Sequence, residues 1–394
     1  MTSRTMSTVD IVDLFAGCGG LTKGFHDFRP ADGDASPFRS VGAVESDIAA
    51  ATTYAANFGV EYTHACRIED WSPDSRASDV DVILGGPPCQ GFSGLGKGDP
   101  DDPRNTLWRQ YVKVVEALRP KIFIIENVDR FLRSPQFTLL RQSAERGGEL
   151  ADYTLKHLIL NAADYGVPQA RRRVIVLATH RDLVASHPDR VPLAHPEPTH
   201  RRATGAAGQE EVELDDGLRP WVPAAVVFDN TPGETVTTQL PEGRDIELLS
   251  RSMPGAFRTR ELHIGRKPTD MSMARYEAIP PGGNRHDLAK HPHLTTKSWL
   301  RHQSGSGDVM GRMFPDRPSV TIRTEFFKPE KGRYLHPTAH RPITHMEAAL
   351  LQGFPEDYLW CGSKTEIARQ IGNAVPVGLG TALAGAVYGY LAAI

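Results

Sequence analysis

Cys89 has the surroundings of a reactive thiol. It lies in Gly85-Gly86-Pro87-Pro88-Cys89-Gln90-Gly91-Phe92-Ser93, directly after an apolar, strand-like run that ends at Leu84. The two prolines stiffen the chain before the thiol, and the glycine after it allows movement, as suits a fixed nucleophile on a closing loop. Loops that follow the strands of an open α/β sheet line its ligand crevice. The alternative is a buried structural cysteine, because cysteine is among the most buried residue types.

Glu126 is the acid that would work with this thiol. It follows the apolar run Lys121–Ile125 and opens the segment Glu126-Asn127-Val128, so we expect it on the neighbouring lip of the same crevice. A thiolate that adds to C6 of a cytosine ring makes C5 nucleophilic toward a methyl sulfonium, and an acid near N3 stabilises that adduct. The alternative for Glu126 is a structural carboxylate that binds backbone N–H groups.

Three arginines precede a further apolar run. Gln169-Ala170-Arg171-Arg172-Arg173 leads into Val174–Ala178. Side chains alternate along a strand, so Arg171 and Arg173 are expected to face the crevice together. Two guanidinium groups there could hold a base or a phosphate and lower the pKa of the Cys89 thiol. A solvated basic strand end would have the same sequence.

A glycine-rich turn and an acid suggest a nucleoside-bearing cofactor. The turn comprises Phe15, Ala16, Gly17, Cys18, Gly19, Gly20 and Leu21, and a helical segment follows it. The acid, Glu45, follows the second strand-like run, where a carboxylate commonly binds a ribose diol. The glycine spacing is not that of a dinucleotide-binding turn, so S-adenosylmethionine is the common candidate. A structural turn and a solvated strand-end carboxylate are the alternatives.

The elements around these residues alternate between strand and helix. Apolar runs span Val9–Phe15, Ser40–Val44, Asp81–Leu84, Lys121–Ile125 and Val174–Ala178, and helical patterns span Asp47–Phe58 and Asn105–Leu118. This alternation predicts a parallel, doubly wound α/β sheet covered on both faces. From about residue 185 to 320 prolines are frequent and the alternation is lost, so we assign no elements there. Thr344–Leu351 and Val377–Leu391 again predict helices, and the C-terminal segment is expected to return to the first domain.

The composition is that of a globular protein of 394 residues, with 40% hydrophobic and 24% charged residues. Its net charge of −3 is not typical of a nucleic-acid binder, but five basic residues crowd one short region, namely Arg251, Arg258, Arg260, Arg266 and Lys267. The four cysteines form no pair with zinc spacing, so we predict no metal site. We find no signal peptide and no membrane-spanning run, and we expect an intracellular protein.

Taken together, these segments resemble the DNA (cytosine-5) methyltransferase family. The matching motifs are DLFAGCGG, the acid of AVESD, GGPPCQGFS, ENV, QARRR, RPITHMEAALLQGFP and QIGNAVP, in the family's order over residues 9–180 and 315–394. The resemblance implies a Rossmann-like S-adenosylmethionine-dependent methyltransferase sheet and a smaller, irregular target-recognition domain. It implies a catalytic domain at residues 1–184, a target-recognition region at 185–320 and a C-terminal segment at 321–394.

The resemblance also implies roles for particular residues. Cys89 would be the nucleophile and Glu126 the partner of N3, supported by Arg171 and Arg173. Cofactor contacts are expected at the glycine-rich turn 15–21 and at Glu45, Ser46, Ile68, Pro88, Leu107, Asn373, Ala374 and Val375. DNA contacts are expected at Gln90 and Ser93. The implied setting is a cytoplasmic, nucleoid-associated monomer that acts on double-stranded DNA, with any cognate restriction endonuclease acting separately.

One position departs from the family. Arg67 precedes Ile68 where the family usually has an aspartate, and Glu69 and Asp70 follow. The usual hydrogen bond to the adenine amino group is therefore in question, and we expect cofactor binding to be retained.

Two other functions are compatible with the same fold. A tRNA methyltransferase would belong to a branch of the family without so long a variable region. A catalytically silent DNA-binding relative would be expected to lack Cys89 or Glu126, and both are present.

Overall fold

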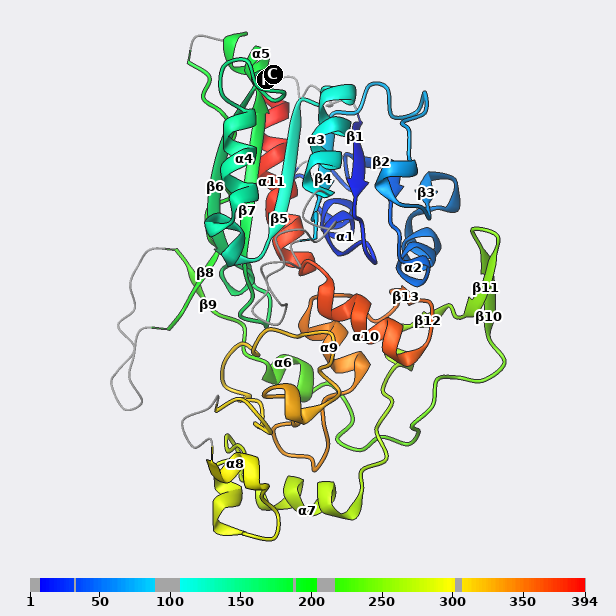
Figure 1. Ribbon diagram of the computed structural model, residues 1–394, viewed down its shortest axis with the longest axis vertical. Coiled ribbons are helices and arrows are strands. Elements are labelled where there is room, and N and C mark those ends of the chain that lie inside the picture. Colours follow the sequence, from blue (N-terminus) through cyan, green and yellow to red (C-terminus); the bar gives the residue numbers. More distant parts are fainter. Residues whose placement is uncertain are drawn as a thin grey trace.

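The computed structural model describes residues 8–31, 33–88, 107–186, 189–203, 217–301 and 307–393, except the side chain of Leu300. These residues form two lobes (Figure 1). The larger lobe contains a seven-stranded sheet, and the smaller lobe lies beyond one end of its strands.

Among the described residues no single helix is long and apolar enough to cross a membrane. One pair of helices, Lys364–Asn373 and Val377–Ala392, passes that test only jointly, with a 42° bend between them.

The sheet has the strand order β3-β2-β1-β4-β5-β7-β6. Its strands are β1 (Val9–Leu14), β2 (Phe38–Val44), β3 (Thr63–His64), β4 (Val82–Gly85), β5 (Ile122–Asn127), β6 (Tyr153–Asn161) and β7 (Arg172–His180). Strands β1 to β5 are mutually parallel. From the centre of the sheet the chain proceeds outward through β1, β2 and β3 on one side and through β4 and β5 on the other, so the order of the strands switches between β1 and β4. The carboxyl ends of β1 and β4 are therefore the expected place for a ligand crevice.

The prediction of a wholly parallel sheet was wrong for β7. This strand runs antiparallel to both β5 and β6. A parallel crossover needs a dozen or more residues and usually a helix, whereas β6 and β7 are joined by residues 162–171, which hold only the short 3-10 turn η6 (Ala162–Tyr165). The sheet is thus mixed, and the start of β7 lies beside the end of β5.

Alternating side chains divide the strands between two hydrophobic clusters. Val12 and Leu14 of β1 belong to one cluster, whereas Val9 and Ile11 belong to the other. The first cluster contains helices α3 (Leu107–Leu118) and α4 (Pro135–Ser143), and the second contains α1 (Gly20–Asp27) and α11 (Val377–Ala392). Figure 1 shows α3 and α4 in front of the sheet and α11 behind it. Both faces of the sheet are therefore covered, as predicted.

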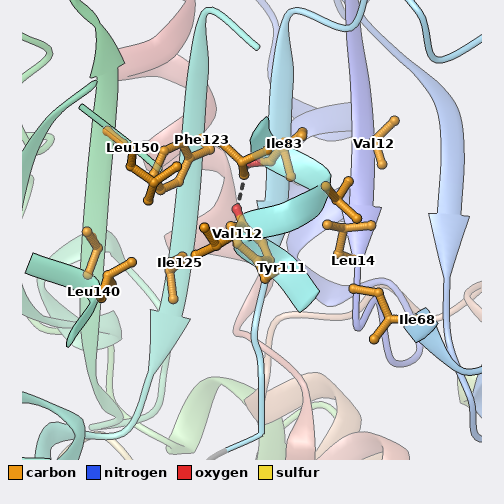
Figure 2. Close-up of a cluster of buried hydrophobic side chains, with 14 of the residues drawn as sticks. Val12, Leu14, Ile68, Ile83, Tyr111, Val112, Phe123, Ile125, Leu140 and Leu150 are labelled. Atoms are coloured by element: carbon orange, nitrogen blue, oxygen red, sulfur yellow. Dashed lines mark hydrogen bonds between the residues drawn. The ribbon is translucent and has the colours of Figure 1, made fainter. Parts of the chain in front are cut away.

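Tyr111 of α3 anchors the first cluster to the sheet. Its ring is fully buried, and its one hydroxyl proton is shared between the carbonyl of Ile124 at 3.0 Å and that of Ile83 at 3.3 Å (Figure 2). A buried hydroxyl without a partner would cost roughly 1–3 kcal/mol. The two bonds fix the helix against β4 and β5, the strands that carry the predicted catalytic loop and acid.

Two further helices agree with the sequence prediction. Helix α2 (Ile48–Phe58) is capped by Asp47, whose side chain accepts from the amides of Ala49 and Ala50. Helix α9 (His345–Leu351) starts with a capping box of Thr344 and Glu347. Each cap satisfies backbone donors that the first helical turn leaves free.

The smaller lobe is built from short elements. They include β10 (Asp245–Leu248), β11 (Arg251–Pro254), β12 (Phe257–Arg258), β13 (Leu359–Trp360), α6 (Ala225–Phe228), α7 (Asp270–Ala278), α8 (Lys297–Arg301) and α10 (Lys364–Asn373); α5 (Arg181–Ala185), β8 (His200–Arg201) and β9 (Arg219–Pro220) precede them. One hydrophobic cluster joins Phe228, Phe257 and Leu262 to Trp360 and Ile371. This cluster includes residues on both sides of the proposed boundary at residue 320, and the domain boundaries remain a prediction.

Helix α11 packs against α1 in the larger lobe. The contact is made by glycines, since a Cβ on Gly24 would lie only 2.5 Å from the carbonyl carbon of Gly380. The two helices therefore touch backbone to backbone. The C-terminal helix thus belongs to the same lobe as the first strand.

Candidate active site

The glycine-rich turn is held open by backbone conformations that favour glycine. Gly17 and Gly19 have φ values of 56° and 85°, and Phe15 has a φ of 58°. A Cβ on Gly17 would meet no atom within 4 Å, so space remains beside the turn. The amide of Ala16 donates to the carbonyl of Val44, which joins the turn to the end of β2.

Glu45 holds this turn from the side. Its carboxylate accepts from the amide of Gly17 at 2.9 Å and from the amide of Asp47 at 2.6 Å. Burial raises the pKa of Glu45, while these two amides partly offset that effect. Ser46, also predicted to bind the cofactor, is exposed next to it. Glu45 therefore lies beside the turn where the sequence placed it, with its carboxylate engaged to backbone donors.

Asp13 is a buried acid that the sequence analysis did not single out. It lies one residue before the end of β1 and is 2% exposed, and the hydroxyl of Thr22 donates to it at 2.6 Å. Burial raises the pKa of Asp13 to about 7. Strand β1 contains two acids, Asp10 and Asp13, so no clear signal in the sequence marks Asp13 as the buried one.

Residues from the far end of the chain complete the turn. A Cβ on Gly20 would lie 2.4 Å from the carbonyl oxygen of Val375 and 3.3 Å from the Cβ of Ala374. The predicted cofactor residues 15–21 and 373–375 are thus in contact. Only glycine permits this approach at position 20.

Cys18 and Leu21 face away from this junction. Cys18 is 2% exposed, belongs to the cluster of the smaller lobe, and its thiol contacts the carbonyl of Gln370 at 3.7 Å. Burial raises the pKa of Cys18 to about 12, which disfavours the thiolate form. Leu21 is 5% exposed within the cluster of α1 and α11. Any cofactor contact at these two positions would come from the backbone.

Apolar residues from three segments meet beside the turn. Ile68 is buried in the cluster of α3, and Phe15 and Leu107 pack against that cluster. Arg67 points to solvent and pairs with Glu69 at 3.0 Å. Three predicted cofactor contacts therefore belong to or pack against one cluster, and Arg67 lies outside it.

Glu126 and Arg173 meet at the predicted reactive end. Arg173 Nε lies 2.7 Å from Glu126 Oε1, and the two side chains are 13% and 12% exposed. A Cβ on Gly86 would lie 3.1 Å from Glu126 Oε2, so the carboxylate faces the segment that leads to Cys89. Asn127 donates from its side chain to the carbonyl of Pro87 at 2.9 Å and holds that segment. Pro88 is the last described residue before residue 89, and Cys89, Gln90 and Ser93 lie outside the described residues.

Arg171 is buried and lies close enough to Arg173 and Glu126 to interact with both electrostatically, and its role at the crevice stays a prediction. It is 2% exposed, and it donates to the carbonyls of Ile322 at 2.8 Å and Gly372 at 2.9 Å. Burial holds the pKa of Arg171 well below its usual value. Its guanidinium therefore joins the start of β7 to the smaller lobe and the end of α10. Arg172 faces outward and pairs with Asp129.

Gln352 is a second residue that the sequence analysis missed. It is fully buried and accepts from the side chain of Gln169 at 2.8 Å, while it donates to the carbonyl of Ile371. Gln169 in turn accepts from the amide of Ile322 at 2.9 Å. This pair of glutamines links the segment before β7 to the end of α9 and to α10. Within the described ranges, no group of three or more His, Cys, Asp or Glu side chains could hold a metal ion.

The fold and this site define an α/β enzyme of the Rossmann-like methyltransferase class. A solved structure from an Escherichia coli prophage, described as a DNA modification methyltransferase, superposes with a TM-score of 0.67 at 22% identity and covers 98% of this chain and 99% of that chain. At 22% sequence identity, this structural similarity establishes that the two proteins share a fold.

Sequence comparison adds the family. The family model for C-5 cytosine-specific DNA methylase matches residues 9–389. The type II methyltransferase M.NgoFVII of Neisseria gonorrhoeae is 32% identical over 93% of this chain and 83% of its own length. The type II methyltransferase M.XorII of Xanthomonas oryzae is 31% identical over 95% and 83%. The chain belongs to the C-5 cytosine-specific DNA methylase family and is a DNA (cytosine-5-)-methyltransferase.

Proposed function

We propose that this enzyme methylates C5 of a cytosine that is flipped out of duplex DNA, with S-adenosylmethionine as donor and a covalent bond between Cys89 and C6. The observation that carries the proposal is the Glu126–Arg173 pair, whose carboxylate faces the segment that leads to Cys89. A thiol nucleophile and an acid are the groups that this reaction requires, and Arg173 would fix the acid.

The described residues fit the donor. Open space lies beside Gly17, Glu45 offers a carboxylate at the edge of the turn, and Phe15, Ile68 and Leu107 form an apolar wall. Those residues would hold the adenosine part of the donor. When bound, the donor supplies an electrophilic methyl group.

The chain's own residues would activate the base. The thiolate of Cys89 forms a bond to C6, and Glu126 shares a proton with N3, so that the ring becomes nucleophilic at C5. Arg173 holds the Glu126 carboxyl in place. After methylation a solvent water accepts the C5 proton. The electrons of that C–H bond form the C5–C6 double bond as the sulfur–C6 bond breaks, which restores the aromatic ring and releases the Cys89 thiolate.

The DNA contacts of this proposal come from residues 185–320 and from Gln90 and Ser93. Extruding a base costs a few kcal/mol, which contacts with the opened duplex offset. We further propose a monomer in the cytoplasm, associated with the nucleoid, with any cognate restriction endonuclease acting as a separate protein. Sedimentation with and without a duplex oligonucleotide tests the monomer.

Two assays test the chemistry. Methyl transfer is measured on duplex DNA and on tRNA, with Cys89→Ala as the inactive variant and Cys66→Ala as the matched control. DNA that contains 5-fluorocytosine should trap wild type and Cys66→Ala covalently, because fluorine at C5 blocks the final elimination. Transfer to tRNA alone would overturn the DNA substrate. Methylation of DNA by wild type without any trapping would overturn the covalent step.

A further inference from the structure

The smaller lobe contains a cavity of about 270 Å³ that is separate from the candidate active site. Its apolar walls include Ile264, Phe327 and Ile343, and its polar lining includes Arg266, His345 and Lys364. Lys364 begins α10 and Asn373 ends it, so about 14 Å of helix separates the cavity from the cofactor turn. None of the residues assigned above to catalysis or cofactor binding lines this cavity.

His345 leaves one ring nitrogen without a partner. The residue is 3% exposed, and its Nε2 lies 2.9 Å from the carbonyl oxygen of Lys364, to which it can only donate. Burial lowers the pKa of His345 to about 4, so the ring is neutral near pH 7 and Nδ1 is an acceptor. Nδ1 has no hydrogen-bond partner in the part of the chain that the structure describes. A buried acceptor without a donor costs roughly 1–3 kcal/mol.

The imidazole also forms part of an aromatic wall. The rings of His345 and Phe327 are stacked, with centroids 5.9 Å apart and an angle of 14° between their planes. Flat rings are thus already arranged next to the apolar side chains of the cavity. A flat aromatic group is the shape that such a wall binds best.

Two cations line the same cavity. The Lys364 ammonium donates to the carbonyl of Thr238. Arg266 is 3.9 Å from Glu330, at the outer limit of an ion pair. Positive charge therefore accumulates at one side of an apolar cavity, where an anion would be stabilised.

We propose that this cavity is a binding site for a small aromatic acid that carries an N–H or O–H donor. The ring of the ligand lies against Phe327 and Ile264, and its acid group meets Arg266 and Lys364. Its donor pairs with His345 Nδ1, an atom that is closed to solvent until the ligand enters. Each part of the ligand thus corresponds to one feature of the cavity. The proposal is independent of the catalytic chemistry proposed above.

The probe for the test is 8-anilinonaphthalene-1-sulfonate, which combines aromatic rings, one sulfonate and one N–H donor. It is titrated into the full chain in the presence of saturating S-adenosylhomocysteine, and its fluorescence reports binding. We expect one molecule per chain. N-phenyl-1-naphthylamine, which keeps the rings and the N–H but lacks the sulfonate, is expected to bind at least tenfold more weakly.

Four variants locate the site. Lys364→Met and Arg266→Met should each weaken binding of the sulfonate at least fivefold, and His345→Phe, which keeps the stacked ring, at least threefold. Lys331→Met, which removes an exposed lysine outside the cavity, should leave the affinity unchanged. Arg266 is exposed, so its variant decides the test even if Lys364→Met fails to fold. Equal affinity in wild type and Arg266→Met, or an equal loss in Lys331→Met, would overturn the proposal.

Discussion

Arg173 reaches diagonally across two antiparallel strands to hold Glu126. The register pairs Glu126 of β5 with Ile175 of β7, and Arg173 lies two residues before Ile175 on the same face. The resulting distance of 2.7 Å joins two side chains that are about seven-eighths buried. Diagonal neighbours of this kind are within reach of long side chains. The antiparallel direction of β7 is therefore what brings the arginine to the acid.

Removing this arginine should slow the chemical step. We expect Arg173→Met to lower the rate of methyl transfer in a single turnover by about 10²-fold, because the Glu126 carboxyl loses the group that fixes it near the base. Protein stability should change little by comparison, since Met keeps most of the volume. The measurement is a rapid-quench assay with duplex DNA.

The neighbouring arginine provides the control. Arg172→Met removes the same charge from a side chain that faces solvent and pairs with Asp129. We expect its single-turnover rate to stay within about threefold of wild type, as surface ion pairs contribute little. An equal loss in both variants would show that overall charge, rather than the Glu126 contact, governs the rate.

The buried glutamine pair should govern stability. In Gln352→Met the carbonyl of Ile371 loses its side-chain donor, and the side-chain amide of Gln169 keeps only its bond to the carbonyl of Leu351 at 3.3 Å. We expect the free energy of unfolding to fall by about 1–3 kcal/mol, the cost of one buried group left unpaired. Urea denaturation measures this, with the exposed Gln142→Met as the control. A loss in the free energy of unfolding no larger than that of Gln142→Met would contradict the prediction.

Glycines on the paired helices give a test of packing. In Gly24→Ala the new Cβ would lie 2.5 Å from backbone atoms of Gly380 and Thr381, which no side-chain rotation can relieve. We expect a loss of about 3 kcal/mol or more in the free energy of unfolding.

Gly389→Ala on the same α11 is the matched control. Its Cβ would meet no atom within 4 Å, so helix propensity should raise stability by about 0.5–1 kcal/mol. Thermal unfolding of both variants should therefore shift in opposite directions. A shift in the same direction would mean that the close approach of the two helices is not required.

Acid should destabilise the smaller lobe through His336. Burial lowers the pKa of His336 to about 4, and its Nδ1 accepts from the amides of Thr338 and Ala339. In the unfolded chain the ring takes up a proton near pH 6.5. The unfolded state thus binds more protons, and the stability that the neutral ring contributes is present above about pH 6.5 and is lost as the pH falls toward 4.

His336→Asn retains an acceptor without the titration. Between pH 7.5 and pH 5, wild type should lose about 2 kcal/mol more stability than this variant in urea denaturation. The exposed His286→Asn should follow wild type. Parallel losses in wild type and His336→Asn would exclude this histidine as the source.

Most of the sheet could be predicted because its strands are buried on both faces. The runs at Val9, Ser40, Asp81, Lys121 and Val174 were confirmed as β1, β2, β4, β5 and β7. Strand β6 was missed, since it lies at the edge of the sheet and its exposed residues interrupt the apolar run. The direction of β7 was missed because apolar content carries no information about strand direction.

The smaller lobe could not be predicted for a different reason. Its strands have two to four residues and its core joins residues more than a hundred positions apart, such as Phe257 and Trp360. Local propensity is weak in such elements. Gln352 was likewise invisible, because a glutamine has no distinctive sequence pattern until its buried partners are known.

The contact between α1 and α11 also constrains how the enzyme is made. Nearly 200 residues separate the end of β7 at His180 from the start of α11 at Val377. At a synthesis rate of about 5–20 residues per second, the nascent sheet waits on the order of 10–40 s for the helix that covers its second face. During that interval, of these two helices, α1 alone contributes to the cluster that holds Val9, Ile11 and Ile124, so this face of the sheet is incompletely covered and a chaperone can reach it.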